Sequence, residues 1–368
     1  MALIWADFPS NSQGLYGTER DRMLDGVWAA LEGNGGSGTH LTLVSDPDPS
    51  IGASGTVLRV SNNTFIQRGA RFALPAGPTQ KVGIACRLWV SALPAGDWNP
   101  YRGPLLAFRT AANVDIANIT VLSNGGIGVA RTNENVDPYG STSVPVITAN
   151  SWNHIEIALD RSDTIGTIEV RVNAITVLEL TGLNLGLVNT GQVFVGTNDH
   201  NGNINNLDNV NYYKDIIFWD GTGTQNNDFL GSVAVIALRP DSDNSFNWTA
   251  SSGSTGFNLI DEAPPVDTDF ISASDALPAA STFNLQNLPP DIVSVKGLIP
   301  ISRARKIDGG DGNLQMGLVG TLTDLGANKA ITTAFTYHWD VSELSPDTGA
   351  PWTPVEVDAV KLQVNRTL

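Results

Sequence analysis

Oxygen-bearing side chains are concentrated in one turn-rich segment, NDHNGNINNLDN, at residues 198–209. Calcium takes six to eight oxygen ligands, and closely spaced Asp and Asn side chains can supply them from a short loop. The segment lacks the glycine at position 6 and the glutamate at position 12 of a helix–loop–helix calcium site. The pattern therefore predicts either a solvated Asn-rich turn or a calcium site with the ligands Asp199, Asn201, Asn203 and Asp208. No other cofactor is expected.

A second turn-rich segment, AGDWNPYRG at residues 95–103, places aromatic rings beside amide and guanidinium donors. Flat aromatic faces with nearby donors suit stacking on sugar rings, and they equally suit a subunit interface or the local core. The side chains that would make these contacts are Trp98, Asn99, Tyr101 and Arg102.

Groups for catalysis follow no recognisable pattern. Glycoside hydrolysis needs two carboxyl groups about 5–9.5 Å apart, and Glu156 and Asp160 share one face of a strand, where ordinary surface charges explain them. GNGGSG at residues 33–38 has the GxGxxG spacing, but it follows a helix-like segment and precedes a strand, the reverse of a dinucleotide site. The histidines lie far apart, and His154 is expected on the solvent face of its strand. We therefore expect a protein that is not an enzyme.

Blocks of opposite charge lie in the second half of the chain. The segment DEAPPVDTDFISASD, residues 261–275, is acidic without a basic residue, whereas SRARK at 302–306 is basic. Such blocks pair either within one chain or between chains, where they set register and orientation. We expect a homo-oligomer assembled largely through this half, using Asp261, Glu262, Asp267, Asp269, Arg303, Arg305 and Lys306.

The elements that must position these groups are mostly strands. In SWNHIEIALDRSDTIGTIEVRVNAITVLEL, residues 151–180, apolar and polar residues alternate with a period of two. Such alternation predicts antiparallel strands with one buried and one solvated face. Ile155, Ile157 and Leu159 would point inward, as would Ile168, Val170 and Val172.

Composition supports the same fold class and excludes several functions. Only 16% of the 368 residues are charged, and there are 37 Gly and 20 Pro, a mixture that favours strands and turns. The net charge of −16 argues against nucleic acid and anionic membranes as partners. The N-terminus has no signal-peptide pattern, and no apolar run is long enough for a membrane helix. Cys86, the only cysteine, is expected to be a buried inert thiol.

The chain divides into two predicted domains. Residues 1–220 would form a two-sheet antiparallel jelly-roll sandwich with a short N-terminal helix in TERDRMLDGVWAAL (18–31). The polar segment 221–227 would be a linker, and residues 228–368 a smaller, mostly β domain. That domain would end in a short helix, with Thr353 as N-cap, Pro354 at N1 and Glu356 at N3.

Two sets of short sequence segments resemble known families. The segment 151–180, with YYKDIIFWDGTG near residue 220, resembles laminin-G-like and concanavalin-A-like jelly rolls over about residues 39–220, although Ala174 stands where many members have Gly. Structural proteins of tailed bacteriophages and phage-like particles contain segments that resemble DFLGSVAVIALRPDSD, DTDFISASD and DTGAPWTPVEVDAVKLQV of this chain.

The resemblance implies a virion protein, such as a spike, fibre, decoration or tail component, that displays a jelly roll for adhesion or assembly. Its partners would be other virion proteins and a host cell-surface glycan, and it would be made in the host cytoplasm. Two alternatives stay open on the same fold. One is a carbohydrate-binding module, and the other is a polysaccharide-degrading enzyme.

Overall fold

The computed structural model describes two compact units. The described residues are 3–7, 30–32, 41–49, 56–61, 68–74, 80–93, 105–131, 138–197, 210–253, 255–262, 265–274, 280–310 and 312–367. One unit covers residues 4–235 and the other residues 236–368. Both are built from antiparallel strands, which confirms the expected all-β class. The predicted linker, 221–227, lies inside the first unit.

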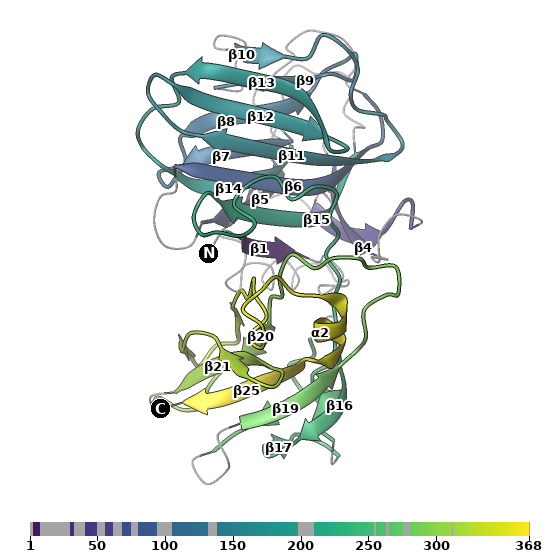
Figure 1. Ribbon diagram of the computed structural model, residues 1–368, viewed down its shortest axis with the longest axis vertical. Helices are drawn as coiled ribbons and strands as arrows, with labels where there is room; N and C mark the ends of the chain where they lie inside the picture. The colour runs from purple at the N-terminus through teal and green to yellow at the C-terminus, as the bar shows by residue number, and fades with distance from the viewer. Residues whose placement is uncertain are drawn as a thin grey trace. The chain divides into compact units, whose positions relative to one another are not determined.

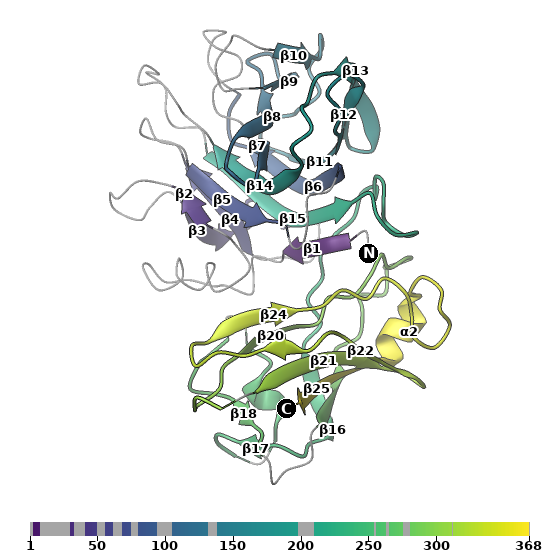
Figure 2. The same cartoon turned by 90° about the vertical axis from the view of Figure 1, so that its left-hand side faces the viewer.

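The first unit is a sandwich of two sheets, seen as separate layers in Figure 2. Sheet A has the strand order β13-β12-β11-β6-β15-β4-β3, and β1 also pairs with β15. It faces the viewer in Figure 1. Its strands are β1 (Leu3–Asp7), β3 (Leu41–Ser45), β4 (Thr56–Ser61), β6 (Lys81–Val90), β11 (Trp152–Asp160), β12 (Gly166–Val172), β13 (Ile175–Leu183) and β15 (Val210–Asp220).

Sheet B forms the second layer, in the order β10-β9-β8-β7-β14-β5-β2. Because neighbours in both sheets are far apart in sequence, such as β15 beside β6 and β14 beside β7, the chain passes repeatedly between the layers. The strands of sheet B are β2 (Ala30–Glu32), β5 (Arg68–Ala73), β7 (Leu106–Thr110), β8 (Asp115–Val121), β9 (Ile127–Ala130), β10 (Pro138–Ser141) and β14 (Thr190–Thr197).

The core lies between the two sheets, and the alternating pattern in residues 151–180 predicts its contribution correctly. Ile157 and Val170 are fully buried and stand opposite each other in the β11–β12 ladder. Phe72 of sheet B stacks on Phe218 of sheet A with 4.6 Å between ring centroids. Cys86 is buried in the same layer, as expected, and burial raises the pKa of its thiol to about 12, so the thiol is protonated at pH 7.

The second unit contains a six-stranded sheet and two two-stranded sheets. The large sheet has the order β16-β19-β25-β21-β22 with β23 on β21, and the small ones pair β17 with β18 and β20 with β24. The strands are β16 (Pro240–Ser245), β17 (Thr249–Ala250), β18 (Ile271–Ser272), β19 (Ala280–Leu285), β20 (Ile301–Ala304), β21 (Asn313–Val319), β22 (Thr323–Leu325), β23 (Lys329–Ala330), β24 (Thr336–Trp339) and β25 (Lys361–Thr367), with a 3-10 turn at Phe257–Leu259.

The predicted C-terminal helix is present as α2 (Pro354–Ala359). The Thr353 hydroxyl accepts from the Glu356 amide, and the Glu356 carboxylate accepts from the Thr353 amide, so the two form a capping box. The Thr353 hydroxyl and then the Thr353 amide donate to the Glu356 carboxylate, and these bonds lower the pKa of Glu356 to about 2. The helix is followed by β25, so the chain closes on a strand rather than on the helix.

The helix predicted over residues 18–31 is wrong at its end, because Ala30 and Leu31 belong to β2. That strand pairs with β5, and a ladder at a sheet edge satisfies backbone groups that a helix would otherwise have satisfied. The rest of the predicted helix lies outside the described residues. Within the described part of the chain, no helix is long and apolar enough to cross a membrane.

Candidate functional site

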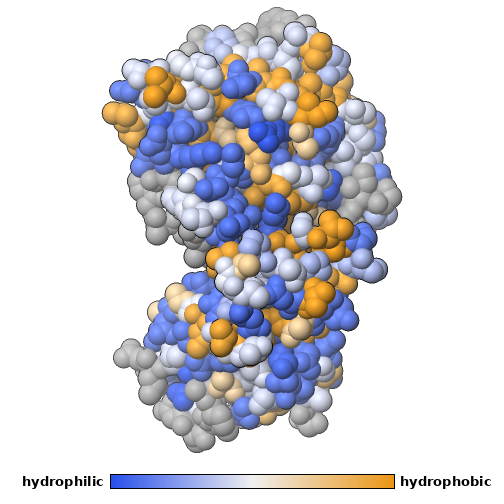
Figure 3. Space-filling model, viewed as in Figure 1, coloured by the Kyte–Doolittle hydropathy of each residue, from blue (hydrophilic) through white to orange (hydrophobic). Residues whose placement is uncertain are grey.

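The outer face of sheet A carries many of the aromatic and charged side chains described in the first unit. Its direction follows from the register. Ile155 stands opposite Cys86 and points into the sandwich, so the next residues in each strand, His154 and Arg87, point outward. Figure 3 shows this face as hydrophobic patches interspersed among hydrophilic ones.

Aromatic residues form a row across three neighbouring strands of this face. Trp152 of β11 is opposite Trp89 of β6, which is opposite Tyr212 of β15. The row continues on β4, where Arg59 is opposite Tyr212. The three rings span two strand spacings, about 10 Å, and Arg59 extends the row to about 14 Å. Trp152 is buried, whereas Trp89, Tyr212 and Arg59 are each half-buried and keep part of their side chains open to solvent.

Trp152 is fixed in place by a buried ion pair. Lys214 Nζ lies 2.6 Å from Asp46 Oδ2, and both side chains are almost completely buried. The Trp152 indole donates to the other Asp46 oxygen at 3.1 Å, and Lys214 lies 4.5 Å from the centre of the Trp152 ring. Trp89 meets Trp152 edge to face at 5.8 Å. One end of the aromatic row is therefore rigid.

A second ion pair lies beside the first because β15 contains a bulge. Asp215 adopts a φ of 52° where the register shifts between Lys214 and Ile217. Its carboxylate accepts from Arg87 Nε at 2.9 Å and from the Val235 amide at 2.9 Å. Burial raises the pKa of Asp215, while the Val235 amide and Arg87 oppose that shift.

Residues 229–235, which we call the strap, run over the central part of this face. Glu156 Oε1 accepts from the Leu230 amide at 2.7 Å and from the Gly231 amide at 3.1 Å. Arg87 donates to the Ser232 hydroxyl at 3.2 Å. The strap is thus held by side chains of two adjacent strands.

An aromatic contact adds to these hydrogen bonds. The guanidinium of Arg171 lies 3.7 Å from the centre of the Phe229 ring, and Phe229 also packs edge-on against Trp219. The strap is therefore anchored on β12 and β15 as well.

Two sequence-based expectations are wrong on this face. Glu156 and His154 were expected on a solvated face, but their exposed fractions are 0% and 2%. Neither ring nitrogen of His154 has a hydrogen-bond partner among the described residues. Burial first and the Arg87 charge second lower the pKa of His154 to about 4, so its imidazole is neutral at pH 7.

The outer face of sheet B also carries polar side chains, but they satisfy one another. Arg109 donates to Asp115 at 2.8 Å, and the Asn118 amide donates to Asp115 at 3.1 Å. Arg109 also lies 4.8 Å from the centre of the buried Phe194 ring. Arg109, Asn118 and Phe194 are each at most 2% exposed, so this network stabilises the sheet and presents little open surface.

The loop sites predicted from the sequence lie outside the described residues. These are the calcium ligands Asp199, Asn201, Asn203 and Asp208 and the aromatic loop residues Trp98, Asn99, Tyr101 and Arg102. Across the part of the chain that the structure does describe, no group of three or more His, Cys, Asp or Glu residues is arranged to hold a metal ion.

The predicted charge blocks of the second unit come together in part within one chain. Arg303 makes a bidentate ion pair with Asp267, with N–O distances of 2.8 and 3.0 Å. Arg303 and Arg305 both lie against the Phe335 ring. Lys306 donates to the Gly310 carbonyl. Partial burial and then the neighbouring charges of Asp261 and Asp269 raise the pKa of Glu262, so these three carboxyl groups lie close together.

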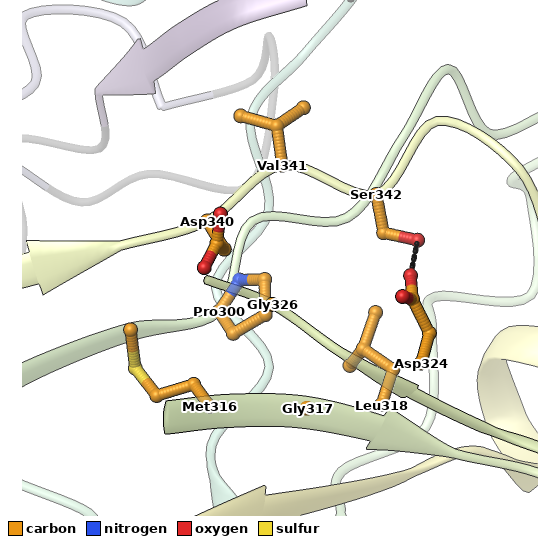
Figure 4. Close-up of a pocket in the computed structure, with 9 residues that line it drawn as sticks. All are labelled: Pro300, Met316, Gly317, Leu318, Asp324, Gly326, Asp340, Val341 and Ser342. Carbon is orange, nitrogen blue, oxygen red and sulfur yellow. Dashed lines mark hydrogen bonds between the residues drawn. The ribbon is translucent and has the colours of Figure 1, made fainter. Parts of the chain in front are cut away.

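The second unit also contains a small cavity of about 40 Å³, shown in Figure 4. Its wall includes Asp324, whose carboxylate accepts from the Ser342 hydroxyl at 2.9 Å. The space holds one or two water molecules and excludes a sugar ring. It is lined by Pro300, Met316, Gly317, Leu318, Asp324, Gly326, Asp340, Val341 and Ser342.

No family model matches this chain, and no curated protein matches it in sequence. Among solved structures, the catalytic domain of a GH131 β-glucanase from Podospora anserina is 13% identical, covers 61% of this chain and 98% of its own, and has a TM-score of 0.38. Alginate lyase vAL-1 from a Chlorella virus is 11% identical, with coverage of 53% and 91% and a TM-score of 0.32. The carbohydrate-binding module CBM66 from Bacillus subtilis is 10% identical, with coverage of 49% and 92% and a TM-score of 0.30.

Other similar structures are much longer than the matched region. A sialidase is 12% identical with a TM-score of 0.32, and this chain spans only 18% of its length. These identities and TM-scores assign no activity to the chain. The neighbours are nevertheless mostly enzymes, which contradicts the expectation of a non-enzymatic protein, and that expectation is withdrawn. None of the neighbours named here is a phage structural protein or a laminin-G module.

Proposed function

We propose that the first unit binds a carbohydrate chain on the outer face of sheet A, along the row formed by Trp152, Trp89 and Tyr212. The observation that carries the proposal is the register that aligns these rings across three strands while leaving two of them half-open. A sugar ring has an apolar C–H face that packs on an aromatic ring and hydroxyl groups at its rim that need polar partners.

The surroundings of the row suit such a ligand. The Lys214–Asp46 pair is buried beside the rings and holds Trp152, which packs against Trp89, in a fixed position. A site whose rings are already oriented loses little side-chain entropy when a ligand binds. The three rings span two strand spacings, about 10 Å, which is enough for about two linked sugars.

The test is binding of the full chain to a glycan array and to insoluble polysaccharides. Trp89→Ala and Tyr212→Ala should each weaken binding about tenfold or more, since truncating a central aromatic contact removes much of the interaction energy. Phe270→Ala is the matched control, because Phe270 is a 41%-exposed aromatic residue of the other unit. Circular dichroism and the melting temperature check that each variant is folded.

Absence of binding to any glycan, or wild-type binding by Trp89→Ala, would reject the proposal. The same samples test cleavage. Reducing ends or shortened chains released from a bound polysaccharide would show that the protein degrades the polymer it binds, and an intact polymer would leave recognition as the activity.

The virion origin, location and partners implied by the sequence resemblance remain proposals, as does a homo-oligomer assembled through the second unit. Adhesion to a host glycan through sheet A would fit a particle component. Stoichiometric amounts of the protein in purified phage particles would support this origin, and its absence from particles would reject it.

A further inference from the structure

Arg59 lies at the open end of the aromatic row. It stands opposite Tyr212, which places its guanidinium on the same outer face as the rings of Trp89 and Tyr212. Its side chain is half-buried, so part of it is accessible from solvent.

Arg59 differs from the other cations of this face in having no carboxylate partner. Within the described strands of sheet A and the strap, each of the others pairs with an acid at 3.4 Å or less, whereas no described carboxylate lies within ion-pair distance of Arg59. The pairs are Lys81–Asp228, Arg87–Asp215, Arg171–Glu169 and Lys214–Asp46.

Three carboxylates near the row are occupied as well. Asp46 and Asp215 are each engaged by a cation and by a further donor, and Glu156 accepts from two strap amides. Among the described residues, an anion that approaches the end of the row therefore meets a positive charge that no carboxylate neutralises. In a chain of net charge −16, this is a local feature and does not reflect a general affinity for polyanions.

We propose that the glycan is acidic and that Arg59 pairs with its carboxylate or sulfate group while the sugar ring packs on Tyr212 and Trp89. This inference rests on the proposed function of the same face. A guanidinium is suited to the task because its planar fork matches two oxygens of one anion and stays charged at every accessible pH. Carboxylate and sulfate share this chemistry, and the experiment separates them.

The experiment measures affinities of the full chain by calorimetry for two matched pairs of probes. One pair is an oligogalacturonate and its methyl ester, and the other is a sulfated galactan oligosaccharide and its desulfated form. The wild-type protein should bind the acidic member of one pair about tenfold or more tightly than the neutral member. The pair that shows the difference identifies the anion.

Arg59→Gln should abolish the difference by weakening only the acidic probe, and it should remove the dependence of that affinity on salt. Arg59→Lys should restore part of the affinity, since it keeps the charge without the fork. Arg239→Gln, a change in the second unit, should bind like the wild type and serves as the control.

The failures of the two proposals are distinguishable. Equal affinity for acidic and neutral probes, or an undiminished preference in Arg59→Gln, would overturn the inference while the binding function stood. No binding of any probe by the wild-type protein, together with a blank glycan array, would overturn both.

Discussion

At the scale of single residues, the buried groups of the sheet A face are the ones that the sequence describes least well. His154 sits at a polar position of an alternating strand, which is the usual place for a solvated side chain. The structure buries it beside Arg87 without a hydrogen-bond partner for either nitrogen among the described residues. Alternation predicts on which face of a sheet a residue lies, but not whether another segment covers that face.

The burial of His154 predicts a dependence of stability on pH. Its pKa falls from 6.5 to about 4 in the folded chain, so between these pH values the unfolded state binds a proton that the folded state does not. Stability should therefore fall as pH drops below 6.5, by up to about 3 kcal/mol once pH is below 4. Above pH 6.5 the imidazole is neutral in both states, so His154 should add nothing to the dependence of stability on pH.

Urea unfolding of the wild type and of His154→Gln at pH 7.5, 5.5 and 4.5 checks this. Carboxyl groups titrate in the same range, so the readout is the difference between the two proteins. The stability lost on acidification should be smaller in His154→Gln. If the two proteins lost the same stability on acidification, the pKa of His154 would not be lowered in the folded state.

At the scale of elements, the strands could be predicted and the strap could not. The hairpin in residues 151–180 has a strict period of two, and the structure confirms its phase through the burial of Ile157 and Val170. The segment that became the strap follows the predicted linker and has no periodicity of its own. Its anchor, Glu156, is 74 residues away in sequence, and no local pattern reports a contact over that distance.

The strap anchor gives a prediction at this scale. Glu156→Ala removes the acceptor of the Leu230 and Gly231 amides, so these two amides should exchange hydrogen faster. Loss of one to two hydrogen bonds should speed their exchange about tenfold or more. Hydrogen exchange followed by mass spectrometry of the strap peptide measures this.

Two variants serve as controls for that change. Glu156→Gln keeps an acceptor oxygen at the same position and should protect the strap nearly as well as the wild type. Asp163→Ala removes an exposed carboxylate that accepts from the Thr164 hydroxyl in the turn between β11 and β12, and it should leave exchange in the strap unchanged. Unaltered exchange in Glu156→Ala would show that the aromatic contacts of Phe229 hold the strap by themselves.

At the scale of the whole molecule, composition and turn signals predict an all-β chain, which the structure confirms, whereas they do not predict the pairing of charges between distant segments. Arg303 and Asp267 were both singled out from the sequence as candidates for contacts between chains, and they pair within one chain. Among the basic residues, Arg305 remains a candidate for a contact between chains, because it is exposed and lies over the Phe335 ring. The cluster of Asp261, Glu262 and Asp269 remains on the acidic side.

The predicted homo-oligomer is therefore best tested by exchanging these remaining charges. If Arg305 of one copy faces the acidic cluster of another, then Arg305→Glu and Asp269→Lys should each dissociate the oligomer, because like charges would face each other across the interface. In an interface related by a two-fold axis, mixing the two variants should restore assembly, since each altered residue then meets its opposite charge. Light scattering at low salt on the wild type, on each variant and on the mixture measures this. Mixing could not repair a folding defect in either variant, so restored assembly in the mixture would identify a direct contact between chains. A monomeric wild type at high concentration would remove the homo-oligomer from the proposal.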